Sequence, residues 1–311
     1  MNTLRIFIAG ASGTLGRRLV PQLVARGHHV VGSTRSRPDE LRALGAEPVV
    51  VDPLDAEALR EAVVRAQPDV VVHQLTALSG LGMMRNFDKA FAVTNKLRTE
   101  GTDNLIAAAR AAGARRLVWQ SYGGWPYARD NGALKTEEDP LDPDPPADAR
   151  ESLAAIRYLE HAVLESDLEG VVLRYAGFYG PGTSIDEGGQ HTELIRKRRF
   201  PLGGDGAGVW SFVHIDDAAA ATVAAIEGSA TGIFNVAGDD PLTTAEWLPA
   251  LARRLGAPQP RHLPGWLVRL AGGPQAYSMM TRQRGASNAK AKRELGWQPE
   301  HTLLDSVGRK V

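Results

Sequence analysis

Three evenly spaced glycines are the first residues in the chain whose pattern indicates chemistry. Gly10, Gly13 and Gly16 follow an apolar run and stand at the start of a helical pattern. Gly10 permits a tight turn, Gly13 lets the backbone approach a pyrophosphate, and Gly16 allows the helix and strand to pack closely. The N-terminus of that helix favours phosphates through free N–H groups and the helix dipole. In this context the spacing predicts a dinucleotide site rather than a purely structural turn.

The next apolar run bears on which dinucleotide binds. It ends in Gly32-Ser33-Thr34-Arg35-Ser36-Arg37, with no acid. Enzymes that prefer NAD usually place an acid here for the ribose 2′-hydroxyl, whereas an arginine grips a 2′-phosphate bidentately. Arg35 and Arg37 therefore predict NADPH, with NADH as the alternative. Arg37 has a second interpretation as a solvated loop residue.

Asp52 lies at the end of the third apolar run and has two interpretations. Its carboxylate suits the adenine amino group of a bound dinucleotide. It also suits the N-terminus of the helix expected to begin near Asp55. The two roles are compatible, and the sequence leaves both open.

Short apolar runs alternate with helical patterns through the first half of the chain. Apolar runs separated by helices indicate a parallel sheet covered on both faces. We predict an α/β fold, a Rossmann-type doubly wound parallel sheet with a smaller, mostly helical C-terminal substrate lobe. Pro21 is expected to bend the first helix without ending it. The predicted strands are 4–9, 29–33, 48–51, 69–74, 115–120 and 170–174, and the predicted helices include 14–26, 55–66, 87–112 and 151–164.

After Tyr175 the alternation loosens and Gly- and Pro-rich segments break up shorter elements. We therefore expect residues 1–176 to form the dinucleotide-binding domain, with 209–236 returning to it. Residues 177–208 and 237–311 are expected to form the substrate lobe, in which 261–285 is a possible lid.

Composition excludes several classes of function. The 311 residues carry 36 Lys+Arg and 36 Asp+Glu, so the formal net charge of zero gives no reason to expect nucleic acid or an anionic membrane as partner. There is no Cys, hence no disulfide, thiolate metal site or cysteine nucleophile, and no His spacing indicates a metal. No signal peptide or membrane-length apolar run is present. We expect a cytoplasmic enzyme, monomeric or homodimeric, with a small-molecule substrate. Asp216-Asp217 is expected at a helix N-terminus rather than in catalysis.

Several motifs together resemble the extended and atypical short-chain dehydrogenase/reductases, the superfamily that contains the NAD-dependent epimerase/dehydratases. The likeness runs almost end to end: GASGTLG, VVVDPLD, PDVVVHQLTAL, the long helical segment with Asn95, VVLRYAGFYGPG, SFVHIDDAAAA and ELGWQP. The resemblance implies the Rossmann fold and a nicotinamide cofactor. The cofactor contacts predicted are Gly10, Ser12, Gly13, Thr14, Leu15, Gly16, Arg35, Arg37, Asp52, Leu54, Leu75, Thr76, Ala77, Gln120, Ser121, Tyr175, Gly177 and Phe178.

The chain departs from the family at the proton donor. The family uses a Ser/Thr hydroxyl with Tyr-x-x-x-Lys, in which Tyr transfers the proton and Lys lowers its pKa. None of the seven lysines here follows a Tyr by four positions. Anchored on Glu160, the resemblance places Ser152 at the Tyr and Ile156 at the Lys. Ser121 matches the first hydroxyl of the Ser-rich turn, while Gly123 takes the catalytic hydroxyl position.

Loss of the acid favours reduction of a carbonyl over the oxidation that epimerases and dehydratases begin with. Hydride attack on a carbonyl needs only stabilisation and protonation of an alkoxide. Ser121 and Tyr127 are the predicted catalytic residues, with Tyr122, water or a substrate hydroxyl as other donors. Atypical family members without the Tyr include reductases of aromatic polyketides. The resemblance thus implies an NAD(P)H-dependent ketoreductase of antibiotic biosynthesis. The alternatives are a catalytically silent NADPH-binding sensor or scaffold and, less favoured, a nucleotide-sugar epimerase or dehydratase.

A flat, polycyclic aromatic substrate would need an apolar pocket. Met and aromatic residues on the expected substrate side suit such a pocket, although each is also a normal core residue. They are Met83, Met84, Phe87, Trp125, Tyr127, Trp266, Tyr277, Met279 and Met280.

Overall fold

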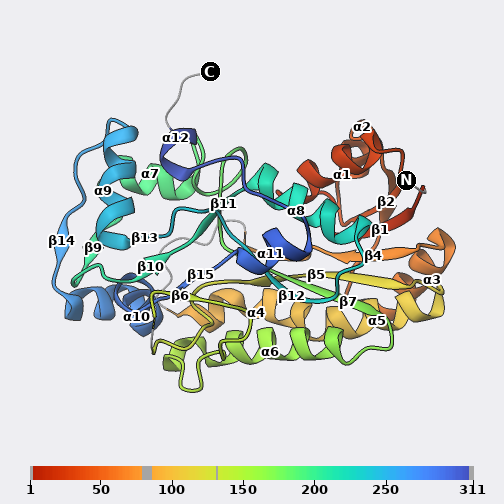
Figure 1. Ribbon diagram of the computed structural model, residues 1–311, viewed down its shortest axis with the longest axis horizontal. Helices are drawn as coiled ribbons and strands as arrows, with labels where there is room; N and C mark the ends of the chain where they lie inside the picture. Colours follow the sequence, from red (N-terminus) through yellow and green to blue (C-terminus); the bar gives the residue numbers. More distant parts are fainter. Residues whose placement is uncertain (1–2, 79–85, 131, 308–311) are drawn as a thin grey trace.

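A seven-stranded parallel sheet forms the centre of the computed structural model, which describes residues 3–78, 86–130 and 132–307 (Figure 1). The strand order is β12-β7-β5-β4-β1-β2-β3, and every neighbouring pair is parallel. The chain reverses its direction of winding between β1 and β4, which is the feature of a doubly wound sheet. The predicted fold class is confirmed. The strands are β1 (Arg5–Ala9), β2 (His29–Thr34), β3 (Glu47–Val50), β4 (Val70–His73), β5 (Arg116–Tyr122), β7 (Glu169–Tyr175) and β12 (Gly232–Val236).

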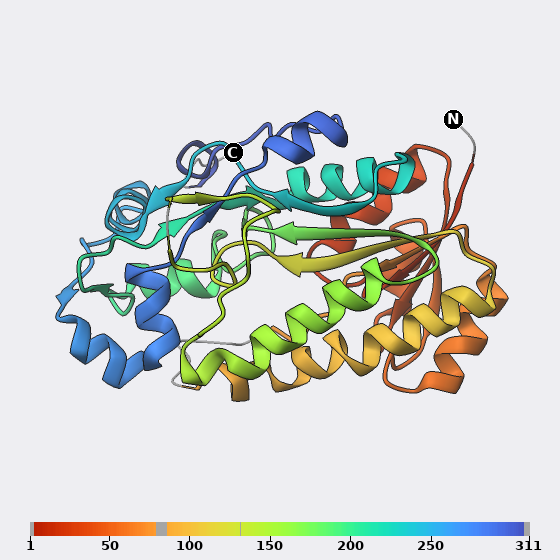
Figure 2. The same cartoon turned by 60° about the horizontal axis from the view of Figure 1, so that its bottom comes forward.

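Helices cover both faces of this sheet (Figure 2). Within β1, Ile6 and Ile8 point to one hydrophobic core while Phe7 and Ala9 point to the other, because successive side chains of a strand alternate. The first core packs under α1 (Gly16–Ala25), α2 (Pro38–Ala43) and α8 (Ile215–Glu227). The second packs under α3 (Ala56–Ala66), α5 (Glu100–Ala111) and α6 (Arg150–Leu164), with α4 (Phe87–Arg98) against α6.

Two predictions about the helices need correction. The segment 87–112 was predicted as one helix but forms α4 and α5, which meet at Thr99. There the backbone of Thr99 leaves the helical region, with φ −99° and ψ −85°. The short helix α2 was not predicted. Helix α1 continues through Pro21, as expected.

The remaining elements form a smaller lobe beyond the carboxyl ends of the strands (Figure 1). Its core contains Tyr179, Phe212 and Trp247. The predicted boundaries of this lobe and the lid at 261–285 stay predictions. Its elements are α7 (Gln190–Arg196), α9 (Thr244–Arg254), α10 (Gly265–Thr281), α12 (Leu303–Ser306) and the short strands β6 (Leu134–Lys135), β8 (Gly177–Tyr179), β9 (Leu202–Gly203), β10 (Val209–Trp210), β11 (Phe212–His214), β13 (Leu242–Thr243), β14 (His262–Leu263) and β15 (Gly285–Ala286). Helix α11 (Ala289–Glu294) packs instead against β12 of the central sheet, and its Ala291 belongs to the first core.

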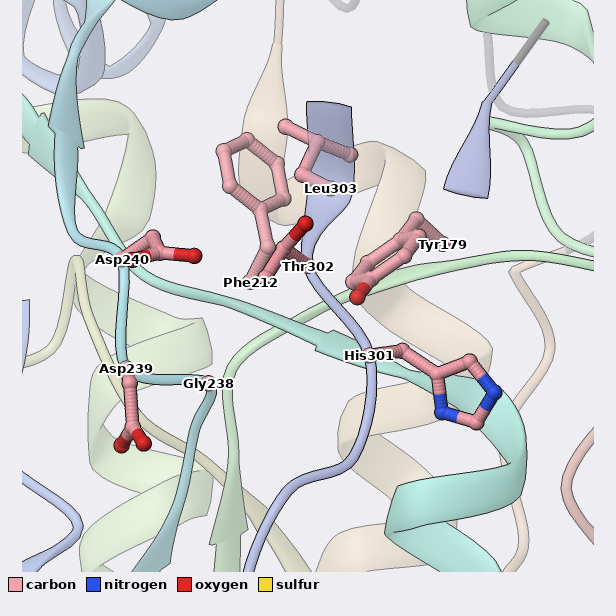
Figure 3. A pocket seen from close by; sticks show the side chains of 8 residues that line it. All are labelled: Tyr179, Phe212, Gly238, Asp239, Asp240, His301, Thr302 and Leu303. Carbon is pink, nitrogen blue, oxygen red and sulfur yellow. The ribbon is translucent and has the colours of Figure 1, made fainter. Parts of the chain in front are cut away.

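One small cavity lies inside this lobe, between Tyr179, Phe212 and His301 (Figure 3). Its volume of about 10 Å³ is room for a single water molecule. This cavity is therefore not where a substrate binds. Across the described residues, no helix is long and apolar enough to cross a membrane, and no cluster of potential metal ligands occurs.

Candidate active site

The glycine turn has the geometry that a bound pyrophosphate requires. Gly10 has φ +87°, and a Cβ there would lie 2.6 Å from the Gln74 carbonyl oxygen. A Cβ on Gly16 would overlap the backbone of Ala11. A Cβ on Gly13 would meet only the Gly10 carbonyl oxygen, at 3.1 Å, and otherwise faces open space. The turn thus packs tightly against β4 and its own loop while leaving an open side at the start of α1, so these residues fit a dinucleotide.

Thr34 connects the glycine turn to the two arginines. The hydroxyl groups of Ser12 and Thr34 lie 2.9 Å apart, and the Arg37 N–H donates to the Thr34 hydroxyl at 3.1 Å. Arg37 forms an ion pair with Glu40 at 3.5 Å. Arg35 is exposed and forms no ion pair or side-chain hydrogen bond within residues 3–78, 86–130 and 132–307. Of the two arginines, Arg35 is the one with its guanidinium free for a 2′-phosphate.

Asp52 does not cap the following helix. Its carboxylate accepts the Leu54 N–H at 3.0 Å, while Asp55 accepts the Ala58 N–H at 3.1 Å and begins α3. The capping interpretation of Asp52 is wrong because the helix starts one residue after Asp55. Asp52 is exposed, and its contact with adenine stays a prediction.

The other predicted cofactor contacts lie on neighbouring strand ends. Because the carboxyl ends of parallel strands share one edge of the sheet, this edge is where α/β proteins bind ligands. The Thr14 hydroxyl donates to the Gly182 carbonyl at 3.3 Å and joins the glycine turn to the loop after β8. The predicted cofactor contacts on this edge are Leu75, Thr76 and Ala77 after β4, Gln120 and Ser121 in β5, Tyr175 at the end of β7, and Gly177 and Phe178 in β8.

Tyr175 is turned into the protein. Its hydroxyl lies 2.7 Å from that of Thr222 and accepts a bond from the Gln74 amide at 3.3 Å. Only 1% of the residue is exposed. Its phenol therefore supports the floor of the site, and a cofactor contact through the hydroxyl is not available.

Ser152, at the position of the family tyrosine, is a structural residue. It is fully buried, and its hydroxyl donates to Asp88 at 2.6 Å while accepting from the Asn95 amide at 3.0 Å. Asp88 also accepts the N–H groups of Glu151 and Ser152, at 3.0 and 2.8 Å. A carboxylate from α4 thus satisfies the N-terminus of α6, where such charge is favourable. No proton donor occupies this position.

Ile156, at the position of the family lysine, belongs to an apolar cluster. With it pack Phe87, Trp125, Leu153 and Met279. The rings of Phe87 and Trp125 meet edge to face with centroids 5.1 Å apart. The place of the family lysine is thus occupied by hydrocarbon.

The predicted pocket residues are only partly brought together. Phe87, Trp125 and Met279 join the apolar cluster, and Met280 is buried nearby on α10. Trp266 is 66% exposed. Met83 and Met84 lie outside the described residues.

Both predicted proton donors are held in a buried polar network. Ser121 is 3% exposed and donates to Glu160 at 2.6 Å. Arg174 grips the same carboxylate with two nitrogens, at 2.8 and 2.6 Å, and donates to the Tyr127 hydroxyl at 3.0 Å. Tyr127 in turn donates to Asn235 at 2.6 Å, and burial raises its pKa. Each hydroxyl proton already has an acceptor, and the catalytic roles of Ser121 and Tyr127 stay predictions.

Tyr122, one of the other donors considered from the sequence, is the phenol without an internal acceptor. It ends β5, lies at the rim of the apolar cluster, and is partly exposed. Its hydroxyl makes no hydrogen bond to any residue that the structure describes, and burial raises its pKa to about 12. It therefore stays protonated near neutral pH and is a free donor. Its place directly after Ser121 was the available signal.

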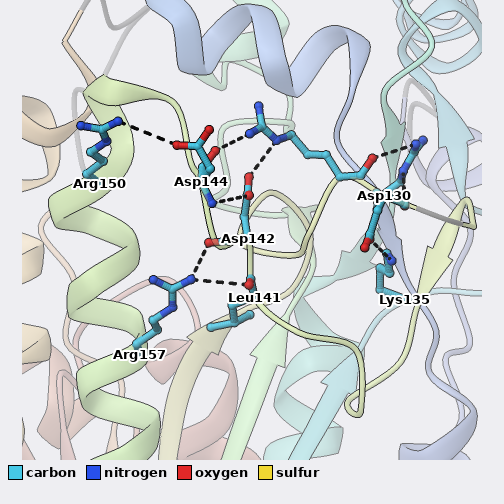
Figure 4. Close-up of polar contacts among 9 residues, drawn as sticks. Asp130, Lys135, Leu141, Asp142, Asp144, Arg150 and Arg157 are labelled. Atoms are coloured by element: carbon cyan, nitrogen blue, oxygen red, sulfur yellow. Dashed lines mark hydrogen bonds and ion pairs between the residues drawn. The ribbon is translucent and has the colours of Figure 1, made fainter.

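The loop that leads from β5 into α6 is held in place by arginines (Figure 4). Arg157 of α6 donates to the carbonyls of Leu141 and Asp142. Arg129 pairs with the Asp142 carboxylate at 2.7 Å, and Arg150 approaches Asp144 at 3.8 Å. These contacts fix the position of the loop relative to α6.

Comparison with known proteins agrees with this architecture. Residues 6–237 match the model of the NAD dependent epimerase/dehydratase family. A 3-diazoavenalumate denitrifying reductase from Streptomyces sp. is 46% identical, over 98% of this chain and 100% of that protein. A 2-alkyl-3-oxoalkanoate reductase from Stenotrophomonas maltophilia is 28% identical, over 98% of each chain. The Bordetella bronchiseptica enzyme WbmG, solved with NAD and UDP, superposes with a TM-score of 0.76 at 22% identity, covering 98% of this chain and 92% of its own. That last likeness concerns the fold alone.

Proposed function

The chain belongs to the NAD-dependent epimerase/dehydratase family, and from this premise we propose that it is an NAD(P)H-dependent reductase that works without a protein general acid. The substrate is a small natural product. A bound reduced nicotinamide supplies the hydride. The chain's own part is to bind the substrate against the outer side of the apolar cluster, hold it in the orientation for hydride transfer and exclude water.

One observation carries this proposal. The two positions from which the family supplies and tunes a proton hold a buried, doubly hydrogen-bonded serine and an isoleucine. Ser121 and Tyr127 each donate to an internal acceptor. An acceptor that needs no protein proton on hydride addition suits such a site best.

An aromatic diazo group is such an acceptor, and we favour it. Hydride addition to the terminal nitrogen of Ar–N₂⁺ gives the neutral diazene Ar–N=NH. Loss of its N–H proton to water breaks the C–N bond and releases N₂, and the ring carbon takes a proton from water to give Ar–H. Charge and atoms balance, and because the hydride step forms no alkoxide, it requires no general acid from the protein. Support comes from the reductase that is 46% identical over nearly the whole chain, whose name contains a diazo group and a denitrifying activity.

A ketone is the second candidate, as the sequence predicted. It would be part of a polycyclic aromatic, polyketide-like compound whose neighbouring hydroxyl provides the proton. The name of the 28% identical reductase, which contains a 3-oxo group, favours a carbonyl. For a ketone, the free phenol of Tyr122 becomes the protein's remaining donor.

We propose NADPH as the preferred cofactor. The exposed, unpaired Arg35 at the end of β2 supports this choice, because a guanidinium binds a 2′-phosphate bidentately. NAD-bound relatives of known structure leave NADH as the alternative.

The experiment offers NADPH with two matched probes, 3-diazonium-4-hydroxycinnamate and 3-acetyl-4-hydroxycinnamate. We expect the diazonium to be reduced with release of N₂, and Tyr122→Phe to change that rate by less than about threefold. If the ketone is the true acceptor, 3-acetyl-4-hydroxycinnamate should be reduced instead. Removing its 4-hydroxyl should then slow the reduction about 10²–10⁴-fold if that hydroxyl is the acid, whereas Tyr122→Phe should do so if the phenol is, since this is the usual effect of losing a general acid. Tyr158→Phe, an exposed phenol on α6, is the matched control. NADPH binding without turnover of either probe would favour the sensor or scaffold.

A further inference from the structure

A second cavity, of about 170 Å³, lies between the loop before α6 and the second half of α10. Three arginines line it, together with aromatic and hydroxyl groups from α10. No cofactor contact predicted from the sequence lies there. The lining residues that matter are Arg129, Arg269, Arg282, Tyr277 and Ser278.

Two of the three guanidinium groups are available to a ligand. Arg129 is engaged with Asp142 at 2.7 Å and with the Asp144 carbonyl. Arg269 and Arg282 are exposed, and in the described part of the chain their side chains form no hydrogen bond and no ion pair. The cavity therefore carries positive charge that the protein itself does not pair.

Asp148, the carboxylate next to the cavity, already accepts a backbone hydrogen bond. Asp148 accepts the Gln275 N–H at 3.0 Å, directly after the break in α10 at Gly273, where φ is +88°. It thus caps the second half of α10 and fixes the start of the turn that carries Tyr277 and Ser278. Burial raises the pKa of Asp148 and the charge of Arg269 opposes that rise, so the two groups interact. Asp148 is nevertheless not within ion-pair distance of Arg269 or Arg282 in the described residues, so both guanidinium groups keep their hydrogen-bond donors for a ligand.

The cavity adjoins the apolar cluster. Ser278 precedes Met279, which packs in that cluster, and Ala147 lies two residues before Ala149, another of its members. The cavity and the cluster are therefore formed by the same two chain segments, residues 147–149 and the second half of α10.

We propose that this cavity binds the carboxylate of the substrate, and that the enzyme acts on an aromatic acid rather than on a neutral compound. The inference rests on the proposed reductase function for the position of the ring. Arg269 and Arg282 bind the carboxylate, and Ser278 and Tyr277 offer further donors. The substrates named for both reductase relatives, an avenalumate and an alkanoate, are carboxylates.

The test compares 3-diazonium-4-hydroxycinnamate with its methyl ester. The parent enzyme should prefer the acid roughly ten- to a hundredfold in kcat/KM, the range for charge-assisted hydrogen bonds. In the double variant Arg269→Gln/Arg282→Gln this ratio should fall to near one, through KM rather than kcat. Arg65→Gln, an exposed arginine in the last turn of α3, should keep the ratio of the parent. An acid preference unchanged in the double variant would overturn the proposal.

A binding measurement separates this proposal from the reductase function. The probe is 4-hydroxycinnamate, which has no reducible diazo group, titrated calorimetrically into the parent and the double variant with NADP⁺ present. We expect at least about tenfold weaker binding to the variant, or about 1.4 kcal/mol. If that difference appears while neither diazonium probe is reduced, the carboxylate site stands and the diazo acceptor fails. Equal binding to both proteins would eliminate the carboxylate site even if turnover is observed.

Discussion

The glycine turn and the start of α6 both belong to the active-site edge of the sheet, but they follow the family pattern to different degrees. At the glycine turn every position that the chemistry needs is present, and the packing tolerates no side chain at Gly10 or Gly16. At the start of α6 the family's proton donor is replaced by Ser152, which is bonded to Asp88 and Asn95. The residue types that bind the cofactor are thus present, while those of the family's proton donor are not.

The start of α6 is as well packed as the glycine turn. Ser152 has both a donor and an acceptor partner, and Ile156 packs with aromatic residues, so neither position contains an unfilled space or an unpaired polar group. Well-packed residues in place of the family's Tyr and Lys suit a site whose substrate accepts a hydride without a proton from the protein. The contrast therefore favours a change of acceptor over loss of activity.

The largest effect should come from filling the glycine turn. In Gly16→Val the new side chain overlaps the backbone of Ala11, which must move and open the turn. We expect NADPH binding to weaken by at least roughly a hundredfold, since the phosphates depend on this turn and the helix start. Gly101→Ala is the control, because its Cβ would make only an ordinary contact with Leu97 at 3.7 Å. Calorimetry gives the affinities, and thermal unfolding checks that both variants fold. Unchanged affinity in a folded Gly16→Val would place the cofactor elsewhere.

The next effect concerns the choice between cofactors. Arg35→Ala removes the unpaired guanidinium at the end of β2, and we expect NADPH to bind about ten- to a hundredfold more weakly, with NADH changed little. Arg37→Ala should have a smaller effect because Arg37 already pairs with Glu40. The parent should bind NADPH more tightly than NADH, and the reverse order would contradict the assignment. Fluorescence titration of both cofactors decides it.

Most of the sheet could be predicted from the sequence because its strands are short apolar runs with clear breaks. The glycine turn was equally predictable, since each glycine has a separate steric reason. The split between α4 and α5 was not, because the helical pattern of the sequence is continuous while the backbone leaves the helical region at the single residue Thr99. The free phenol of Tyr122 was also hidden, because only tertiary structure shows that Ser121 and Tyr127 already have acceptors.

A smaller effect is expected on the free energy of unfolding when the pH is lowered, and it arises in the central sheet that carries both regions. His73 of β4 is buried, which lowers its pKa to about 4, and its ring stacks on Trp119 at 5.4 Å. The folded state keeps this imidazole neutral while the unfolded chain takes up a proton below its ordinary value of 6.5. Stability due to this residue is therefore complete above pH 6.5 and falls as the pH drops toward 4.

At about pH 5, relative to neutral pH, His73 should cost the parent about 2 kcal/mol of unfolding free energy. His73→Phe keeps an aromatic ring against Trp119 and should lose that part of the pH dependence. Urea unfolding of parent and variant at both pH values measures the difference. The other histidines contribute equally to the pH dependence of both proteins, so their contributions cancel in the difference. His29→Gln, whose side chain is 43% exposed, should behave like the parent. Equal pH dependence in parent and His73→Phe would mean that His73 is protonated in the folded state.

The smallest effect on rate is expected where the family has its acid. Ser152→Ala removes a hydroxyl that donates to Asp88 and accepts from Asn95. We expect stability to fall by about 1–3 kcal/mol, because the buried Asp88 and the half-buried Asn95 lose a partner. The rate of hydride transfer in single-turnover measurements should stay within about threefold, because Ser152 is fully buried and its hydroxyl bonds only to Asp88 and Asn95. Ser166→Ala, at the C-terminal end of α6, controls for loss of a serine that bonds only to backbone. A folded Ser152→Ala whose transfer rate drops about 10²–10⁴-fold would show a general acid at work. The start of α6 would then follow the family pattern in function although not in residue type, and the contrast with the glycine turn would disappear.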